Sequence, residues 1–373
     1  MGINQSKHFI EELLERAGVK INGYRPYDIQ IYKDHFYQRV RKGGYLALGE
    51  SFMDGWWDCY ALDQFIDRIL RTKIETGVKK NRKLLWHTLK SKLLNLQNNR
   101  RANQVAECHY DIGNDLYKIM LDRRMVYTCA YWKDTAELDA AQEAKLDLVC
   151  RKMNLEPGMT VLELGCGFGS FAKYAAEKYG VTVTGINISQ EQVNHGREIC
   201  RGLPVELILD DYRNAAGTYD RVVSIGIMEH VGYKNYRTYM ETVNRTLNDD
   251  GIAFFHTIGG NASRSACNEW TSKYIFPNSV IPSISQLGLA MEGLFVMEDW
   301  HNFGPDYDRT LMAWHDRFEH AWPDIRDKYG DRFHRMWRFY LLCSAGAFRS
   351  RTIQLWQVVM TKPGRAQPDC RLN

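Results

Sequence analysis

The pattern of apolar and polar residues differs between the two halves of the chain, and the second half alternates two kinds of segment. Short runs rich in β-branched and apolar residues predict strands at residues 160–164, 181–188, 205–210, 221–225, 252–257 and 353–361. Longer segments between them predict helices at about 139–153, 170–179, 189–201 and 234–247. Strands that alternate with helices in this way predict an α/β fold with a mostly parallel, doubly wound sheet.

The first predicted strand runs directly into a glycine-rich turn, V-L-E-L-G-C-G-F-G (161–169). Glycine permits a tight turn at positive φ and lets a ligand lie against bare backbone, and open α/β sheets bind nucleotides at this place. Glu163 stands inside the motif, where it would repel a phosphate but suit S-adenosylmethionine (SAM), which carries an ammonium and a sulfonium. We interpret Glu163, Gly165, Gly167 and Gly169 as a SAM-binding loop; a purely structural turn is the alternative.

Three regions follow from the arrangement of these segments along the chain. We predict a small, mainly helical N-terminal domain at residues 1–78 and a basic linker segment at residues 79–104. The domain that contains the glycine-rich loop is predicted at residues 105–373. Residues 79–101 contain eight lysines and arginines and no acid, and the interspersed leucines fit an amphipathic helix. The span 259–351 is too long for a simple connection and is rich in aromatic residues, so we expect a helical insertion that covers the mouth of the active site.

Composition narrows the class of protein. The chain has 373 residues, of which 45% are hydrophobic, which is enough for a full core. No run of about 18 apolar residues suggests a transmembrane helix, and the first twenty residues lack the apolar core of a signal peptide. The nine cysteines are scattered without a C-x-x-C pair, which indicates free thiols in a reducing compartment and disfavours a disulfide framework or a zinc site.

The ends of the second and third strands supply further polar groups for a ligand. Asn187 and Gln192 follow the second strand and suit the hydroxyl groups of a ribose, although Ser189 between them also predicts a helix cap. Asp211 and Tyr212 follow the third strand, where the carboxylate could accept from an adenine amine and the ring could stack on the base. An ordinary surface loop is the alternative for this pair.

The fourth and fifth strands end in a pair of acid–base residues. Glu229 and His256 fall at neighbouring strand ends in apolar surroundings, beside the expected position of the SAM methyl group. A single residue of either kind is usually structural, but two at adjacent strand ends favour an acid–base or anion-positioning role. Cys129, which is followed by aromatic residues, predicts a buried thiol, and its composition alone favours a structural role over a functional one.

Taken together, these motifs closely resemble the cyclopropane-fatty-acyl-phospholipid synthases, relatives of the mycolic acid cyclopropane synthases. The matching runs cover nearly the whole chain in family order. They are G-E-S-F-M-D-G-W-W (49–57), H-Y-D-I-G-N-D-L-Y (109–117), Y-T-C-A-Y-W (127–132), E-L-G-C-G-F-G (163–169), M-E-H-V-G (228–232), H-T-I-G (256–259), K-Y-I-F-P-N (273–278), E-D-W-H-N-F-G (298–304) and A-G-A-F-R (345–349). The N-terminal domain places the chain with the branch that acts on phospholipids, because the mycolate-type enzymes lack it.

The resemblance implies a fold and a reaction. The fold is a Rossmann-like class I SAM-dependent methyltransferase sheet with a helical insertion, plus the small helical N-terminal domain. The reaction transfers the methyl group of SAM to the cis double bond of an acyl chain in a membrane phospholipid. The resulting carbocation loses a proton to bound bicarbonate, and the ring closes to a cyclopropane. Aromatic side chains, Tyr307 first among them, would stabilise the cation through their quadrupoles.

The resemblance also assigns residues. The bicarbonate site comprises Cys129, Glu229, His256, Tyr307 and, through its backbone, Ile258. The SAM contacts comprise Tyr127, Thr128, Gly165, Gly167, Asn187, Gln192, Tyr212 and Arg213. Two positions depart from the family pattern: Asn187 stands where threonine is frequent, and Ser344 stands where the family has a cysteine, with Cys343 one place earlier. The second departure disfavours a nucleophilic cysteine.

The implied substrate and family suggest partners. We expect a cytoplasmic protein, peripherally associated with the inner face of the cytoplasmic membrane, and a homodimer. The basic segment 79–104 suits anionic lipid, although a solvated linker helix is equally consistent; no recognition motif supports nucleic acid. Two other functions stay open: an acyl-chain methyltransferase with a methyl-branched or methylenated product, and a catalytically silent lipid-binding protein.

Overall fold

The computed structural model describes residues 3–72 and 114–372, which divide into two compact units built from separate stretches of sequence. The sheet unit comprises the described residues 114–265, 278–306 and 354–372. The helical unit comprises the described residues 3–72, 266–277 and 307–353. The predicted boundaries near 78 and 104, and the basic linker segment between them, lie outside the described residues, so this division into domains stays a prediction.

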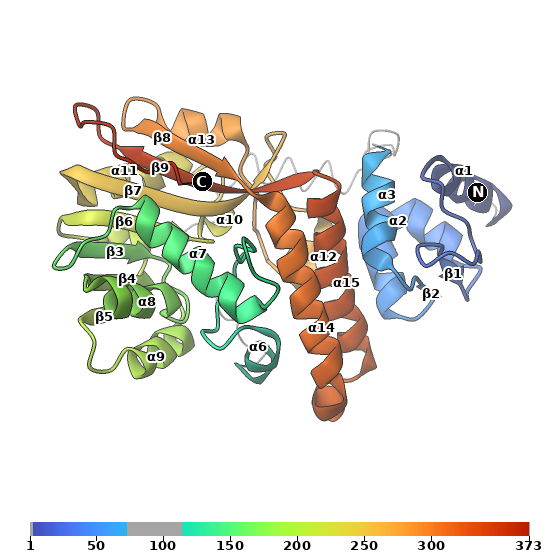
Figure 1. Cartoon of the computed structure of the whole chain (residues 1–373). Coiled ribbons are helices and arrows are strands. Elements are labelled where there is room, and N and C mark those ends of the chain that lie inside the picture. The colour runs from blue at the N-terminus through green and yellow to red at the C-terminus, as the bar shows by residue number, and fades with distance from the viewer. Residues whose placement is uncertain (1–2, 73–113, 373) are drawn as a thin grey trace. The chain divides into compact units, whose positions relative to one another are not determined.

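The sheet unit is organised by a seven-stranded sheet of order β5-β4-β3-β6-β7-β9-β8 (Figure 1). Its strands are β3 (Thr160–Leu164), β4 (Thr182–Asn187), β5 (Val205–Leu209), β6 (Tyr219–Ile225), β7 (Leu247–Gly260), β8 (Val296–Asn302) and β9 (Ile353–Thr361). Strand β3 pairs in parallel with both β4 and β6, and β6 pairs in parallel with β7. The chain therefore adds strands first on one side of β3 and then on the other, and the carboxyl ends of β3, β6 and β7 share one edge of the sheet.

Helices pack on both faces of this sheet because its strands alternate two sets of apolar side chains. The helical elements of this unit are α6 (Asn114–Met120), α7 (Leu138–Lys152), α8 (Ser170–Tyr179), α9 (Gln190–Ile199), the short 3₁₀ turn η2 (Tyr212–Asn214), α10 (Met228–Val231), α11 (Tyr236–Thr246) and α13 (Ile284–Met291). Val161 and Val223 pack in one core with residues of α7, α8 and α9. Leu162 and Val222, one place away on the same strands, pack in the other core with residues of α11 and α13. This alternation is the period of two expected of strands buried on both faces.

The predicted strands and helices of the sheet unit are confirmed, with ends that differ by a few residues. Helix α8 and strand β9 agree at both ends, whereas β7 begins five residues before the predicted 252. The span 259–351 is largely helical, as expected, but it also contains the strand β8, which the sequence did not predict. This strand carries Glu298, Asp299 and His301, so its sequence lacks an apolar run; antiparallel pairing with β9 makes it a strand.

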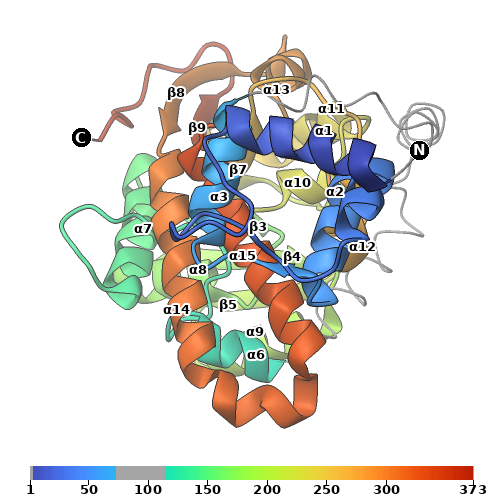
Figure 2. The ribbon, with the colours of Figure 1, turned by 90° about the vertical axis from the view of Figure 1, so that its right-hand side faces the viewer.

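The helical unit is built around aromatic side chains. Its elements are α1 (Ile3–Arg16), β1 (Gln30–Ile31), α2 (Phe36–Met53), β2 (Trp57–Asp58), α3 (Leu62–Arg71), α12 (Glu269–Tyr274), α14 (Gly304–Tyr329, most of which belongs here) and α15 (Asp331–Arg349). Helices α14 and α15 form a hairpin (Figure 2), joined at Gly330 with φ of 76°. Phe339 of α15 lies 5.5 Å from Phe52 of α2 and 4.7 Å from Trp270 of α12, between ring centroids. Segments from three parts of the sequence thus share one core.

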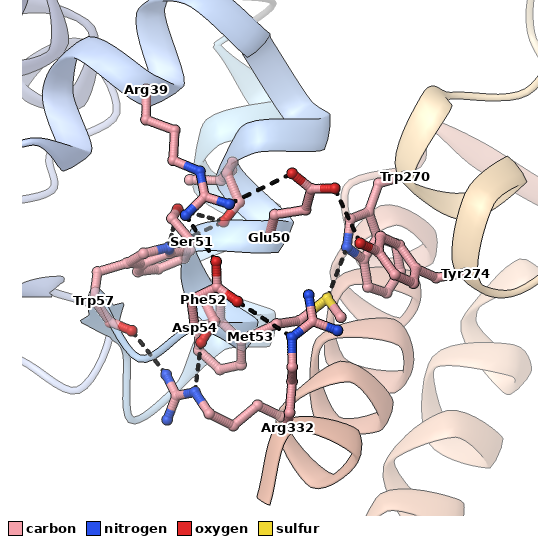
Figure 3. A network of polar contacts seen from close by, with 12 residues as sticks. Arg39, Glu50, Ser51, Phe52, Met53, Asp54, Trp57, Trp270, Tyr274 and Arg332 are labelled. Carbon is pink, nitrogen blue, oxygen red and sulfur yellow. Dashed lines mark hydrogen bonds and ion pairs between the residues drawn. The ribbon is translucent and has the colours of Figure 1, made fainter.

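Polar contacts reinforce this packing around the motif G-E-S-F-M-D-G-W-W (Figure 3). Glu50 accepts hydrogen bonds from Lys273 Nζ at 2.6 Å and from Tyr274 Oη at 3.0 Å. Asp54 pairs with Arg39 at 2.8 Å and with Arg332 at 3.2 Å. The motif therefore ties α2 to α12 and α15, which accounts for its charged residues within the fold.

Within the described residues, no helix is long and apolar enough to span a membrane.

Gly259 on β7 is a position where the fold requires the absence of a side chain. A Cβ atom there would overlap the Trp356 ring of β9, which is buried. We expect Gly259→Ala to lower the free energy of unfolding by about 1–3 kcal/mol through overpacking. Gly288→Ala is the matched control, because Gly288 lies inside α13 with no atom within 4 Å of a Cβ there; it should stabilise by about 0.5–1 kcal/mol. Urea unfolding of both variants checks the pair, and equal stabilities would contradict the expectation.

Candidate functional site

The glycine-rich loop lies at the carboxyl end of β3, at the point where the order of strands reverses. Gly165, Gly167 and Gly169 have φ of 75°, 51° and 81°, a region that residues with a Cβ rarely adopt. The amides of Gly165 and Cys166 donate to the carbonyl of Ile186 at 2.8 and 3.1 Å, which fixes the loop to the end of β4. The loop therefore presents bare backbone at the place where such sheets bind nucleotides.

Glu163 lies in β3 directly before this loop, and its side chain is buried. Its Oε2 has no hydrogen-bond partner among the described residues. Burial raises the pKa of Glu163 to about 8, and the charge of Lys145 and the amide of Ala172 oppose that rise. A buried, incompletely satisfied carboxyl group suits a cationic group of a ligand and disfavours a phosphate, so these residues fit SAM.

The structure brings Asn187 and Gln192 together next to the glycine-rich loop. Asn187 Nδ2 donates to the carbonyl of Gly167 at 3.1 Å and to Gln192 Oε1 at 2.8 Å. Ser189 Oγ accepts from the amide of Gln192 at 3.4 Å, so the predicted helix cap exists as well. The two predicted roles are compatible, because the cap fixes the start of α9 and the amide pair lies beside the loop.

Asp211, Tyr212 and Arg213 follow β5 and form a compact local turn. Asp211 caps η2 by accepting from the amide of Arg213 at 3.0 Å, and it pairs with the Arg213 guanidinium at 3.2 Å. The Tyr212 ring is buried and lies 5.6 Å from the ring of Tyr239, between centroids. These contacts hold the turn rigidly, and its predicted contact with adenine stays a prediction.

The segment before the sheet also reaches the strand ends. Thr128 Cγ2 lies 2.9 Å from the place of a Cβ at Gly226, which follows β6. Tyr127 packs on Tyr117, with ring centroids 5.0 Å apart. Cys129 is fully buried, and its thiol donates to the carbonyl of Ala130 at 3.1 Å. The predicted buried thiol is therefore present, in a segment that lies against the end of β6.

Glu229, Ile258 and His256 meet at the ends of β6 and β7. The amide of Ile258 donates to Glu229 Oε1 at 2.6 Å, and the amide of Gly226 donates to the carbonyl of His256 at 2.8 Å. Glu229 Oε2 and His256 Nε2 are buried and have no hydrogen-bond partner among the described residues. Burial raises the pKa of Glu229 to about 7, which the amide of Ile258 opposes, and burial lowers the pKa of His256 well below its usual value.

Gln357 of β9 completes the surroundings of His256. Its Nε2 lies 3.5 Å from His256 Nδ1, and the side chain is fully buried. When Gln357 donates to Nδ1 of His256, Nε2 of the imidazole carries the proton. A neutral imidazole that donates through Nε2, beside a carboxylate oxygen that can accept, fits a small anion that carries a hydroxyl group; bicarbonate has this chemistry.

Two other predicted positions belong to the helical unit. The Tyr307 ring stacks on Phe348 at 4.6 Å and lies 6.0 Å from Trp314, between centroids. Cys343 lies in α15 one place before Ser344, and burial raises the pKa of its thiol. A thiol with a raised pKa is a poor nucleophile. Cys343 therefore does not replace the cysteine that the family has at position 344. The role of Tyr307 in the site stays a prediction.

Three buried polar residues of the sheet unit were missed by the sequence analysis. Lys145 Nζ donates to Thr128 Oγ1 at 2.9 Å, and Gln142 Nε2 donates to the carbonyl of Thr128 at 2.8 Å. Gln357 contacts His256 as described above. No motif marks these residues, and a lysine or glutamine is normally assigned to the solvent. The usable signal was their position: Gln142 and Lys145 lie in a helix expected to pack on the sheet, and Gln357 lies in a predicted strand.

A mostly parallel α/β sheet with a glycine-rich loop at its switch point, a carboxylate directly before that loop and helices on both faces defines a class I SAM-dependent methyltransferase fold. This confirms the predicted fold class. The family model of mycolic acid cyclopropane synthetase matches residues 97–358. The chain belongs to the mycolic acid cyclopropane synthetase family, as its motifs suggested.

Relatives span almost the whole chain. The cyclopropane-fatty-acyl-phospholipid synthase of Escherichia coli (strain K12) is 50% identical over 94% of this chain and 92% of its own length. The tuberculostearic acid methyltransferase UfaA1 of Mycobacterium tuberculosis is 29% identical over 89% of this chain and 82% of its own length. Among solved structures, the mycolic acid cyclopropane synthase CmaA1 in complex with SAH and CTAB is 28% identical with a TM-score of 0.66, over 70% of this chain and 98% of that chain.

Proposed function

We propose that this protein is a cyclopropane-fatty-acyl-phospholipid synthase. It would convert the cis double bond of an unsaturated acyl chain in a membrane phospholipid to a cyclopropane ring, with SAM as the donor of the added carbon. The observation that carries the proposal is the buried pair Glu229 and His256, each with an unpartnered polar atom, at strand ends beside the glycine-rich loop. The similarity to the E. coli synthase supports the same assignment.

The loop and its neighbours would bind SAM. Gly165 and Gly167 offer bare backbone, Glu163 offers a carboxylate to a cationic group, and Asn187 and Gln192 offer amides to the ribose. SAM supplies the electrophilic methyl group. These side chains orient it and keep it from water, since Glu163, Asn187 and Gln192 are all buried.

Glu229 and His256 would hold bicarbonate, which supplies the base that removes a proton from the methylated chain. His256 Nε2 donates to the anion, and Glu229 Oε2 accepts its hydroxyl proton. Ile258 fixes the other oxygen of Glu229 through its amide, so the carboxylate cannot rotate freely. Cys129 lies buried with its thiol donating to the carbonyl of Ala130, and the family resemblance places it in the bicarbonate site.

The proposed substrate determines where the protein works. A phospholipid acyl chain lies within a bilayer leaflet, so the proposal includes peripheral contact with the inner face of the cytoplasmic membrane. The basic segment 79–104 is a candidate for this contact on its charge, and its residues lie outside those described. A homodimer is proposed from the family resemblance alone.

Mass spectrometry of lipids tests the function. The protein is incubated with SAM, bicarbonate and vesicles of a cis-unsaturated phospholipid, and the acyl chains are analysed. We expect a gain of one CH₂ with loss of the alkene. A gain of CH₂ with an alkene retained would instead indicate an acyl-chain methyltransferase whose product is methylenated or methyl-branched. No change of mass, with SAM still bound, would indicate a lipid-binding protein.

A further inference from the structure

Lys145 of α7 is a buried cation that the proposed mechanism does not yet use. Its side chain is fully buried, and its Nζ donates to Thr128 Oγ1 at 2.9 Å. An ammonium has three N–H donors, and no carboxylate lies within ion-pair distance of Lys145 in the part of the chain that the structure describes. Burial lowers the pKa of Lys145 to about 8, whereas Asp122, Cys129 and Glu163 raise it through their charges.

A residue in this position does little for the stability of the fold. Removing an ammonium from water costs several kcal/mol, and one hydrogen bond to a hydroxyl does not offset that cost. Methionine has a similar volume and would fill the same space without a charge. Groups that lower stability persist where a ligand needs them, so Lys145 is a candidate for a role in binding.

The contact with Lys145 determines what the hydroxyl of Thr128 can do. An ammonium only donates, so Thr128 Oγ1 must accept from it, and the proton of the hydroxyl remains for another acceptor. Gln142, three residues before Lys145 on α7, donates to the backbone carbonyl of Thr128 at 2.8 Å. Helix α7 therefore holds both the backbone and the side chain of Thr128, which lies against Gly226 at the end of β6.

Glu163 is a buried carboxyl group whose charge interacts with that of the buried cation Lys145. The charges of Lys145 and Glu163 interact, yet the two side chains form no ion pair, and Glu163 Oε2 has no partner among the described residues. The site thus contains a buried cation with a fixed hydroxyl donor, and separately a buried carboxyl group. An α-amino acid group carries a carboxylate and an ammonium. Its carboxylate is complementary to Lys145 and the Thr128 hydroxyl, and its ammonium is complementary to Glu163.

We propose that Lys145 is a positioning residue for the amino-acid end of SAM: it fixes the Thr128 hydroxyl as a donor to the carboxylate of the ligand and places a positive charge behind it. Glu163 then faces the ammonium of the same ligand. The inference rests on the proposed function, in which SAM is the ligand. It adds to the predicted contacts a residue that no motif contains.

Ligand truncation separates this role from a structural one. S-adenosylhomocysteine has the amino-acid group, and 5′-methylthioadenosine lacks it while keeping the nucleoside and the sulfur. We expect Lys145→Met to weaken calorimetric binding of S-adenosylhomocysteine by at least about tenfold, since hydrogen bonds to charged groups are the stronger ones, and to change binding of methylthioadenosine by less than about twofold. Without ligand, Lys145→Met should unfold at an equal or higher urea concentration than the wild type.

Two further variants complete the test. Thr128→Val keeps the volume of the side chain and should show the same selective loss. Lys152→Met is the matched control, because Lys152 lies on the same helix, is equally buried, and bonds to Asp299 at 2.9 Å; it should lower stability without changing the ratio of the two affinities.

The outcomes are distinct. An equal loss of affinity for both ligands in Lys145→Met and Thr128→Val, or no loss for either, would overturn the inference and leave Lys145 a structural residue. Wild-type protein that binds neither ligand would contradict the proposed function itself, and the inference with it.

Discussion

Glu229→Gln should lower the rate of cyclopropane formation by at least about 100-fold, which is the usual cost of losing one preorganised polar group of an active site. The substitution keeps the shape of the side chain and its oxygen for the amide of Ile258. It removes the negative charge and turns an acceptor into a donor where the hydroxyl of bicarbonate would bind. The rate is measured by mass spectrometry of the acyl chains at saturating SAM, with calorimetric binding of S-adenosylhomocysteine as a second readout that should stay unchanged.

A second buried glutamate provides the control for this experiment. Glu298 of β8 is 5% exposed and accepts from Thr361 Oγ1 at 2.6 Å, on the same sheet as Glu229. Glu298→Gln should keep the rate within about threefold while testing the general effect of changing a buried carboxyl group. A Glu229→Gln enzyme that retains a tenth of the wild-type rate would contradict the proposed role of Glu229 in the reaction.

The same substitution should stabilise the protein above neutral pH. Burial raises the pKa of Glu229 to about 7 from an ordinary value of 4.5. Between these values the folded protein keeps the proton and the unfolded chain has lost it, so ionisation favours unfolding and stability falls as the pH rises from about 4.5 to 7. Above pH 7 the loss is complete, and each pKa unit corresponds to about 1.4 kcal/mol. Glu229→Gln removes this loss, on the order of 3 kcal/mol at pH 8.

Urea unfolding at pH 5 and at pH 8 measures this effect. The stability of Glu229→Gln relative to the wild type should rise between the two pH values. Glu163→Gln should behave in the same way with a midpoint at higher pH, because the pKa of Glu163 is raised to about 8. The exposed Glu241→Gln is the control for loss of a carboxylate and should change stability by less than about 0.5 kcal/mol at pH 8. A difference between Glu229→Gln and wild type that is the same at both pH values would contradict the pKa assignment.

These predictions share one physical cause. Glu163, Glu229 and His256 each keep a buried polar atom without a partner among the described residues. Such atoms destabilise a fold unless a ligand satisfies them. A protein that becomes more stable and less active when one of them is replaced shows that the group is retained for binding or chemistry.

The sequence by itself determined the features that depend on short stretches of chain. The period of apolar residues predicted β3 to β7, β9 and the helices between them, because burial on both faces of a parallel sheet leaves a local pattern. The glycines at 165, 167 and 169 predicted a turn at positive φ, since few other residues adopt that conformation. The predicted strand ends then pointed to Glu229 and His256 as an acid–base or anion-positioning pair, and the structure brings these residues to neighbouring strand ends.

Only the tertiary structure decided the features that depend on contacts between distant segments. Strand β8 has a polar sequence and forms because β9 supplies its hydrogen bonds. Helices α12 and α15 share a core with α2, although each lies more than two hundred residues after α2 in the chain. Lys145 contacts Thr128, and Gln357 contacts His256, because the fold packs their segments together. No local sequence pattern predicts these contacts. A buried polar side chain is recognised only when its partner is known, and that partner is chosen by the fold.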